Sequence, residues 1–218
     1  MKKIRAGLLI VAVMMFVSGA ALCSELKEIQ LPPPRTDGGM PLMQALKLRS
    51  TSRSFSPKEL PMEVLSDMLW AAFGVNRPEK GGRTAPSAMN WQEIDIYVAL
   101  NSGLYIYDAK KHSLVPVLGE DIRAFTGIQP MAKEAPVSFV FVADFSKMKP
   151  VTKDEKIFYS AADTGYISQN IYLYCASEGL VTGVRGMVDR PALEKKMGLR
   201  KDQRVILAQS SGYASESK

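Results

Sequence analysis

Apolar residues recur at helical spacing in three stretches of the chain, and each stretch predicts a helix. The first covers residues 40–48. The second covers residues 61–73, with Pro61 at its start and Gly74 as its stop. The third and longest covers residues 153–178, and the small side chains in its stripe would permit another helix to approach closely. The stripe residues are Ile157, Ala161, Gly165, Ser168, Ile171 and Cys175.

Apolar and polar residues alternate between residues 94 and 117, which predicts antiparallel strands joined by tight turns. The expected strands are 94–98, 104–107 and 114–117, with turns at 101–103 and 110–111. The uninterrupted apolar run 137–143, ended by Asp144, indicates a central strand buried on both faces. A last strand is expected over residues 204–208.

The remaining segments are short or polar. Short helical pieces are expected within 120–133, and a short helix over 189–198 has Asp189 as its N-cap and Gly198 beyond its end. The loop 76–87 is too polar for the core. Because strands and helices follow one another in mixed order with hairpins, the sequence predicts an α+β fold, an antiparallel or mixed central sheet flanked by helices.

The first 23 residues have the pattern of a secretory signal peptide. A basic start is followed by an apolar run over 6–17 and by small residues over 18–21. Cleavage is expected after residue 20, 21 or 23, and an uncleaved anchor is the alternative. We therefore expect an exported protein, periplasmic or extracellular, with no stable membrane insertion after cleavage. Residues 24–39 contain three consecutive prolines and predict an extended leader, and residues 40–218 predict a single domain.

Composition and charge exclude several classes of protein. The chain is 46% hydrophobic and 23% charged, close to the globular average and unlike a disordered chain. Its net charge of +6 falls to +3 without residues 1–23, because 28 Lys+Arg against 22 Asp+Glu becomes 25 against 22. So small an excess gives no case for nucleic-acid binding. One histidine and two cysteines are too few for a zinc site, so no metal is expected.

The histidine and the second cysteine have ordinary expected positions. His112 follows a hairpin turn and is expected on the surface. Cys175 lies in an apolar stretch of the long helix and is expected to pack in the core rather than to react. If Cys23 leaves with the signal peptide, Cys175 has no partner for an internal disulfide.

Three segments could carry chemistry, and each also has an ordinary structural interpretation. The first runs from Arg49 to Phe55 and holds two arginines, Arg49 and Arg53, with hydroxyl side chains between them. Guanidiniums and hydroxyls can converge on an anion such as phosphate. The alternative is a solvated loop with incidental basic residues.

The second segment precedes the first strand of the meander. Pro86 fixes a turn, and the small Ser87 and Ala88 would let a planar ligand approach the backbone. Asn90 and Gln92 can make paired amide hydrogen bonds. A capped turn is the alternative.

The third segment, residues 178–186, contains three glycines. Glycines allow the backbone to pass close to a ligand and to offer its N–H groups. A helix end followed by an ordinary strand is the alternative. Elsewhere the chain has neither a phosphate-binding P-loop pattern nor the glycine pattern of dinucleotide-binding folds.

In this order the three segments resemble those of the nitroreductase family of flavin-dependent oxidoreductases, over roughly Met40 to Tyr213. In that family an Arg-x-Ser-x-(Arg/Lys)-x-aromatic segment binds the phosphate and ribityl part of FMN. The corresponding residues are Arg49, Ser50, Thr51 and Arg53, with Thr51 in place of the usual serine. A Pro-Ser-x-x-Asn-x-Gln segment meets the flavin from the other subunit of a homodimer, and it corresponds to Pro86, Ser87, Ala88, Asn90 and Gln92. The backbone facing the flavin ring corresponds to Thr182, Gly183, Val184 and Arg185.

One feature of the chain departs from the family pattern, and another points to a subgroup within the family. Many relatives place a basic residue beyond the final Gly-aromatic pair, where it completes the phosphate site. Here only Lys218 follows Gly212 and Tyr213, and Arg185 is the alternative. The run 82–87 leans toward the subgroup that contains the azoline-oxidising dehydrogenases.

The resemblance implies an exported, homodimeric FMN-dependent oxidoreductase with FMN at the subunit interface. It would transfer hydride through flavin N5 to or from a small stacked substrate such as a nitro compound or a quinone, with the protein supplying binding and electrostatics. Arg53 or Arg185 is the candidate for the positive charge near the flavin's N1–C2=O edge. The electron donor stays open because nicotinamide cofactors are scarce outside the cytoplasm, and no catalytic side chain is identified. The alternatives are an azoline or peptide dehydrogenase-like flavoenzyme, a flavin-binding electron-relay protein without its own turnover, and a binding domain that has lost the cofactor.

Overall fold

A seven-stranded sheet forms the centre of the fold in the computed structural model, which describes residues 26–215. The strand order is β1-β6-β5-β4-β7-β9-β8, and every neighbouring pair is antiparallel. The strands are β1 (Ile29–Gln30), β4 (Ile94–Leu100), β5 (Gly103–Asp108), β6 (Ser113–Leu118), β7 (Val137–Asp144), β8 (Val181–Arg185) and β9 (Gln203–Gly212). The predicted α+β class with an antiparallel central sheet is confirmed.

Strand β7 lies between β4 and β9, and all of its residues are buried. Its side chains alternate between the two faces of the sheet. Phe139 and Phe141 belong to the larger apolar cluster with α2 and α4, whereas Val140 and Val142 pack in a second cluster with α5. Both faces are therefore covered, which explains the uninterrupted apolar run in the sequence.

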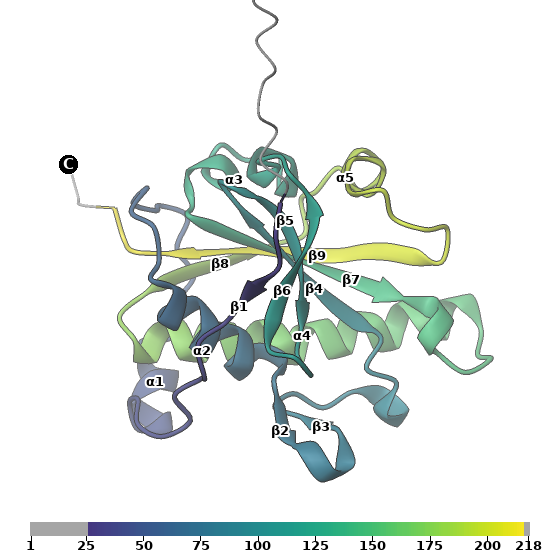
Figure 1. The fold of residues 1–218 in the computed structure, drawn as a ribbon, viewed down its shortest axis with the longest axis horizontal. Coiled ribbons are helices and arrows are strands. Elements are labelled where there is room, and N and C mark those ends of the chain that lie inside the picture. The colour runs from purple at the N-terminus through teal and green to yellow at the C-terminus, as the bar shows by residue number, and fades with distance from the viewer. Residues whose placement is uncertain (1–25, 216–218) are drawn as a thin grey trace, which may run out of the picture.

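The helices begin and end close to the predicted positions. They are α1 (Leu42–Leu48), α2 (Met62–Phe73), α3 (Met131–Glu134), α4 (Lys153–Ser177) and α5 (Arg190–Met197), with short 3-10 turns η1 (Pro78–Lys80), η2 (Ala88–Asn90), η3 (Arg123–Thr126) and η4 (Phe145–Lys147). Helix α4 begins with a capping box between Thr152 and Glu155. It runs the width of the sheet, with α1 and α2 near its C-terminal end (Figure 1).

Three segments differ from their predicted form or extend it. The polar loop 76–87 contains a small hairpin of β2 (Val75–Arg77) and β3 (Gly82–Arg83), which projects away from the sheet (Figure 1). The extended leader contributes β1, which pairs with β6. Strand β9 is longer than predicted because it pairs with β7 on one side and with β8 on the other.

The predicted signal peptide and Lys218 lie outside the described residues. Within residues 26–215, no helix combines the length and the apolar character needed to cross a membrane.

His112 is not the surface residue that the sequence predicted. Its ring is partly buried, with Nε2 2.7 Å from the Ser66 hydroxyl and Nδ1 2.9 Å from the Tyr107 hydroxyl. Because burial disfavours the charged imidazolium, the pKa of His112 is lowered. Hairpin position alone did not reveal that α2 covers this turn. Cys175 is buried as predicted, and burial raises the pKa of its thiol to about 12.

Candidate functional site

The arginine segment lies along the free edge of the sheet, beside β8. The Ser52 N–H donates to the carbonyl of Thr182 at 2.9 Å, and β8 is the last strand in the sheet order. A Cβ on Gly183 would overlap the carbonyl oxygen of Ser52. Glycine at position 183 therefore allows the arginine segment to approach β8 this closely, which joins the first and third predicted segments.

Tyr172 of α4 ties these two segments to the long helix. Its hydroxyl accepts from the Val184 N–H at 3.0 Å and lies 3.0 Å from the Thr51 hydroxyl. The guanidinium carbon of Arg49 lies 5.4 Å from the centroid of the Tyr172 ring, within cation–π range. Tyr172 is not among the residues predicted from the sequence, because its place between apolar residues of a long helix gives no local signal of this role.

The third segment is a strand rather than a loop. Residues 181–185 form the edge strand β8, so the ordinary interpretation of this segment is correct for its backbone. The three glycines therefore do not form a flexible loop beneath a ligand. The strand nevertheless presents one edge to the arginine segment and the other to β9.

Arg185 is a buried cation without an ion-pair partner among the described residues. Its side chain donates to the Ser210 hydroxyl at 2.6 Å and to the Thr126 hydroxyl at 3.0 Å, and the residue is 3% exposed. Its Nε is buried without a partner in the described chain, and burial lowers the pKa of Arg185 to about 10. The guanidinium is turned toward β9 and Thr126 rather than toward the arginine segment, so the geometry does not support it as the missing phosphate ligand.

Side chains of the second segment make hydrogen bonds within the chain through groups that were expected to bind a ligand. The Gln92 side chain accepts from Arg83 Nε at 2.9 Å and donates to the Gly81 carbonyl at 2.8 Å and to Asn90 Oδ1 at 2.9 Å. These bonds fasten the segment to the β2–β3 hairpin. The amide hydrogen bonding expected of Asn90 and Gln92 thus takes place within the chain, and the part of these two residues in flavin binding stays a prediction.

The second segment is also bonded to α4, at a point distant from Tyr172. The Ala88 N–H donates to Asp163 Oδ2 at 2.8 Å. Asp163 and Tyr172 are nine residues apart, which corresponds to roughly 13 Å along a helix. The structure thus brings Arg49–Phe55 and β8 together at one half of α4, and it places residues 86–92 at the other half.

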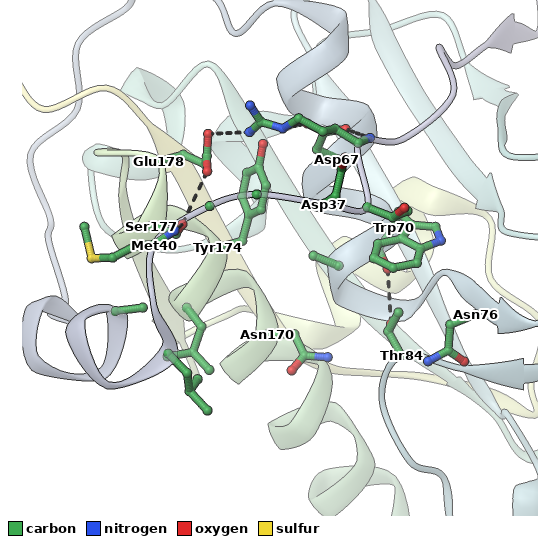
Figure 2. Close-up of a pocket in the computed structure, with 18 residues that line it drawn as sticks. Asp37, Met40, Asp67, Trp70, Asn76, Thr84, Asn170, Tyr174, Ser177 and Glu178 are labelled. Atoms are coloured by element: carbon green, nitrogen blue, oxygen red, sulfur yellow. Dashed lines mark hydrogen bonds and ion pairs between the residues drawn. The ribbon is translucent and has the colours of Figure 1, made fainter.

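A cavity of about 450 Å³ lies between residues 35–40, α1, α2 and α4 (Figure 2). Arg35 spans its rim, with Nη2 2.8 Å from Glu178 Oε2 and Nε 3.8 Å from Asp67 Oδ2. The Met40 N–H donates to the Ser177 hydroxyl at 2.7 Å. None of the residues selected from the sequence lines this cavity, so it is separate from the candidate cofactor site.

Comparisons with known proteins concern the family and the fold of the chain. The model of the family described as "Nitroreductase family" matches residues 46–213. A relative from Methanocaldococcus jannaschii, whose name assigns it provisionally to the nitroreductases, is 31% identical over 165 residues, which cover 71% of this chain and 81% of the relative.

Solved structures show the same fold. A chain from Ralstonia eutropha, also described provisionally as a nitroreductase, is 43% identical with a TM-score of 0.85, over 89% of this chain and 92% of that chain. The NADPH:FMN oxidoreductase from Vibrio harveyi has a TM-score of 0.62 at 18% identity, over 80% of this chain and 69% of that one, and shows the fold alone. The match of the family model over most of the chain, together with the 31% and 43% identical relatives, shows that the protein belongs to the nitroreductase family of oxidoreductases.

Proposed function

We propose that the protein is an FMN-dependent oxidoreductase whose cofactor binds at the edge of β8. The observation that carries this proposal is the collection of positive charge there. Arg49 and Arg53 lie beside β8 and have no ion-pair partner among residues 26–215. The buried Arg185 is the last residue of β8. Cations gathered at one edge favour the binding of an anion there, and FMN would supply negative charge at two points, its phosphate and its reduced ring.

The described residues fit FMN with distinct contributions. Arg49, held over Tyr172, and Arg53 would bind the phosphate, with the hydroxyls of Ser50 and Thr51 completing its acceptor contacts. Bound FMN would supply hydride transfer at N5 to or from a small planar substrate such as a nitro compound or a quinone. Arg185 would stabilise negative charge at the ring because its own charge is buried without a carboxylate.

We further propose that the working form is a homodimer with FMN at the subunit interface. The first half of α4 exposes large apolar side chains: Ile157, Phe158 and Tyr166 are 46%, 68% and 51% exposed. Helix α1 likewise leaves Leu42 and Met43 exposed. A surface of this kind is typical of protein interfaces. Pairing through α4 would bring residues 86–92 of one protomer to the β8 edge of its partner.

Export stays part of the proposal. The basic start and apolar run of residues 1–23 support it, and the chain would then acquire FMN after translocation. The electron donor would be a membrane redox chain, a small thiol or the dehydrogenated substrate itself.

The visible absorption of oxidised flavin in the purified protein tests the central proposal, followed by titration of the apoprotein with FMN. Hydrogen bonds to charged groups contribute about 1.5–3 kcal/mol each. The double variant Arg49→Ala/Arg53→Ala is therefore expected to bind FMN at least 100-fold more weakly. Arg204→Ala, at an exposed arginine of β9, is the matched control and should bind as the wild type does. A protein that stays colourless with added FMN, or unchanged affinity in the double variant, would contradict the proposal.

A further inference from the structure

Two carboxyl groups are buried beneath the segment 87–92. Glu93, directly before β4, is 0% exposed, and Asp163, in the first half of α4, is 3% exposed. Each contacts the segment above it: Glu93 Oε2 accepts from the Ser87 hydroxyl at 3.3 Å, and Asp163 Oδ2 accepts from the Ala88 N–H at 2.8 Å. The flavoprotein proposal does not require a pair of buried acids at this position.

The segment they contact has a backbone that needs support. Met89, Asn90 and Gln92 have φ angles of 50°, 53° and 49°, in the left-handed region that side chains other than glycine rarely adopt. Such a conformation persists only where surrounding contacts fix it. The Gln92 N–H donates to the Ser87 hydroxyl at 2.8 Å, so Ser87 connects Glu93 with the strained residues.

The second oxygen of Glu93 has no partner in the described part of the chain. Glu93 Oε1 is buried and unpaired there, as are Thr164 Oγ1 and Trp91 Nε1. A carboxylate in that position would be strongly destabilised, whereas a carboxylic acid carries an O–H that can be donated to a nearby acceptor.

The groups that face Glu93 add no positive charge. Asp163 on α4 is the charged neighbour, while Ser87 on its own segment and Ser160 on α4 present hydroxyls. Asp144 on β7 donates its N–H to the Glu93 carbonyl, and its carboxylate is paired with Arg200 at 2.7 Å. Burial is the largest cause that raises the pKa of Glu93, and the negative charge of Asp163 raises it further.

We propose that Glu93 keeps its proton in the folded chain, and that protonated Glu93, together with Asp163, is the positioning element that holds residues 87–92 in the conformation the flavin site requires. The inference rests on the proposed function, because the role of residues 87–92 in flavin binding does. When Glu93 loses its proton, a buried carboxylate remains beside Asp163 without a positively charged partner among the described residues, and the segment above it is released. Flavin affinity therefore falls toward alkaline pH.

The proton on Glu93 also makes the stability of the fold depend on pH. Because the pKa of Glu93 is higher in the folded than in the unfolded chain, the native state binds the additional proton. The stabilisation is fully present below the ordinary carboxyl pKa and is lost as pH rises from there through the folded-state pKa. Over that interval one proton changes the folding equilibrium constant by up to tenfold per pH unit.

FMN titration and urea unfolding of the full chain between pH 5 and pH 9, on wild type and Glu93→Gln, form the test. Glutamine resembles the protonated acid in shape and cannot lose its proton. The wild type is expected to bind FMN at least threefold more weakly at the alkaline end than Glu93→Gln, relative to their affinities at pH 5. The matched control is Asp95→Asn on β4, where burial also raises the carboxyl pKa but the partner is Lys147. It should keep the wild-type profile of FMN affinity, and the comparison cancels the titration of FMN itself.

Parallel wild-type and Glu93→Gln profiles in both measurements would overturn the inference. If the wild type binds no FMN at any pH, the proposed function fails, and the unfolding measurement decides the inference by itself. A free energy of unfolding that falls more steeply with rising pH in the wild type than in Glu93→Gln supports the proton on Glu93. Equal slopes refute it.

Discussion

The two halves of α4 differ in which of their residues are buried. From Ile167 to Cys175 the apolar stripe is buried beneath the sheet, and Tyr172 joins it to β8. In the first half, the predicted stripe residues Ile157, Ala161 and Gly165 are exposed. The residues that this half buries are instead the polar Ser160, Asp163 and Thr164. The spacing of apolar residues thus indicates that a helical face is amphipathic. It does not indicate whether that face is covered by the same chain or by another.

Each half also holds a different part of the proposed flavin site. The buried half contacts the arginine segment and β8, and the exposed half contacts residues 86–92 through Asp163. One straight helix keeps these parts separated within a protomer. A two-fold arrangement of two such helices would bring the parts together in pairs.

The largest expected contrast concerns the thiol in the buried half. A pKa of about 12 for Cys175, against about 8.5 for a free thiol, lowers its thiolate fraction by roughly 1,000-fold at pH 8. In a Cys23→Ser variant, the native protein should react with a disulfide reagent at least 1,000-fold more slowly than the urea-unfolded protein. A reaction rate of the native protein within tenfold of the unfolded rate would show that the Cys175 thiol is accessible to the reagent.

An acidic substitution in the exposed half should disrupt self-association. Phe158→Asp places a charge where the proposed dimer would bury an apolar ring, and central interface residues are commonly worth about 2–4 kcal/mol. The dimer dissociation constant should rise by roughly 30- to 1,000-fold in sedimentation equilibrium. Val117→Asp, at an exposed apolar residue of β6, is the control and should leave association unchanged. An unaffected Phe158→Asp dimer would move the interface elsewhere.

Removal of one hydroxyl in the buried half should weaken the fold itself. Tyr172→Phe leaves the Val184 N–H without its acceptor, at a cost of about 1–3 kcal/mol in the free energy of unfolding. Urea denaturation measures this loss. Tyr166→Phe makes the same chemical change on an exposed tyrosine and should alter stability by less than about 0.5 kcal/mol. Equal effects of the two substitutions would deny Tyr172 its connecting role.

The smallest expected effect is that of Gly165→Ala, which should stabilise the protomer and weaken the dimer. Gly165 is exposed in the protomer, and a Cβ there would contact nothing within 4 Å. Gly165→Ala should therefore raise protomer stability by up to about 1 kcal/mol through helix propensity. In the dimer the added methyl should weaken association if a second helix approaches this position. Gln169→Ala provides the comparison on the same exposed surface, and association unaffected by either change would place no helix beside Gly165.

The residue pattern was sufficient for most local elements. The caps of α5, the stop at Gly74 and the turns of the β4–β6 meander depend on neighbours within a few residues, and these are found as expected. The three segments of the candidate site stay predictions as flavin-binding regions, although the structure joins the first and the third. Their roles were less predictable, because those depend on contacts between distant parts of the chain.

The sequence by itself determined which stretches fold into helices and strands and which faces must be covered, because these properties arise from backbone preferences and side-chain polarity over short distances. Only the tertiary structure decided that residues 181–185 form an edge strand, that Arg185 is buried and that Gln92 is bonded within the chain. It also placed Glu93 against α4 beneath the strained segment. Burial and the loss of water around a charge arise from packing between remote elements, and no local pattern records them.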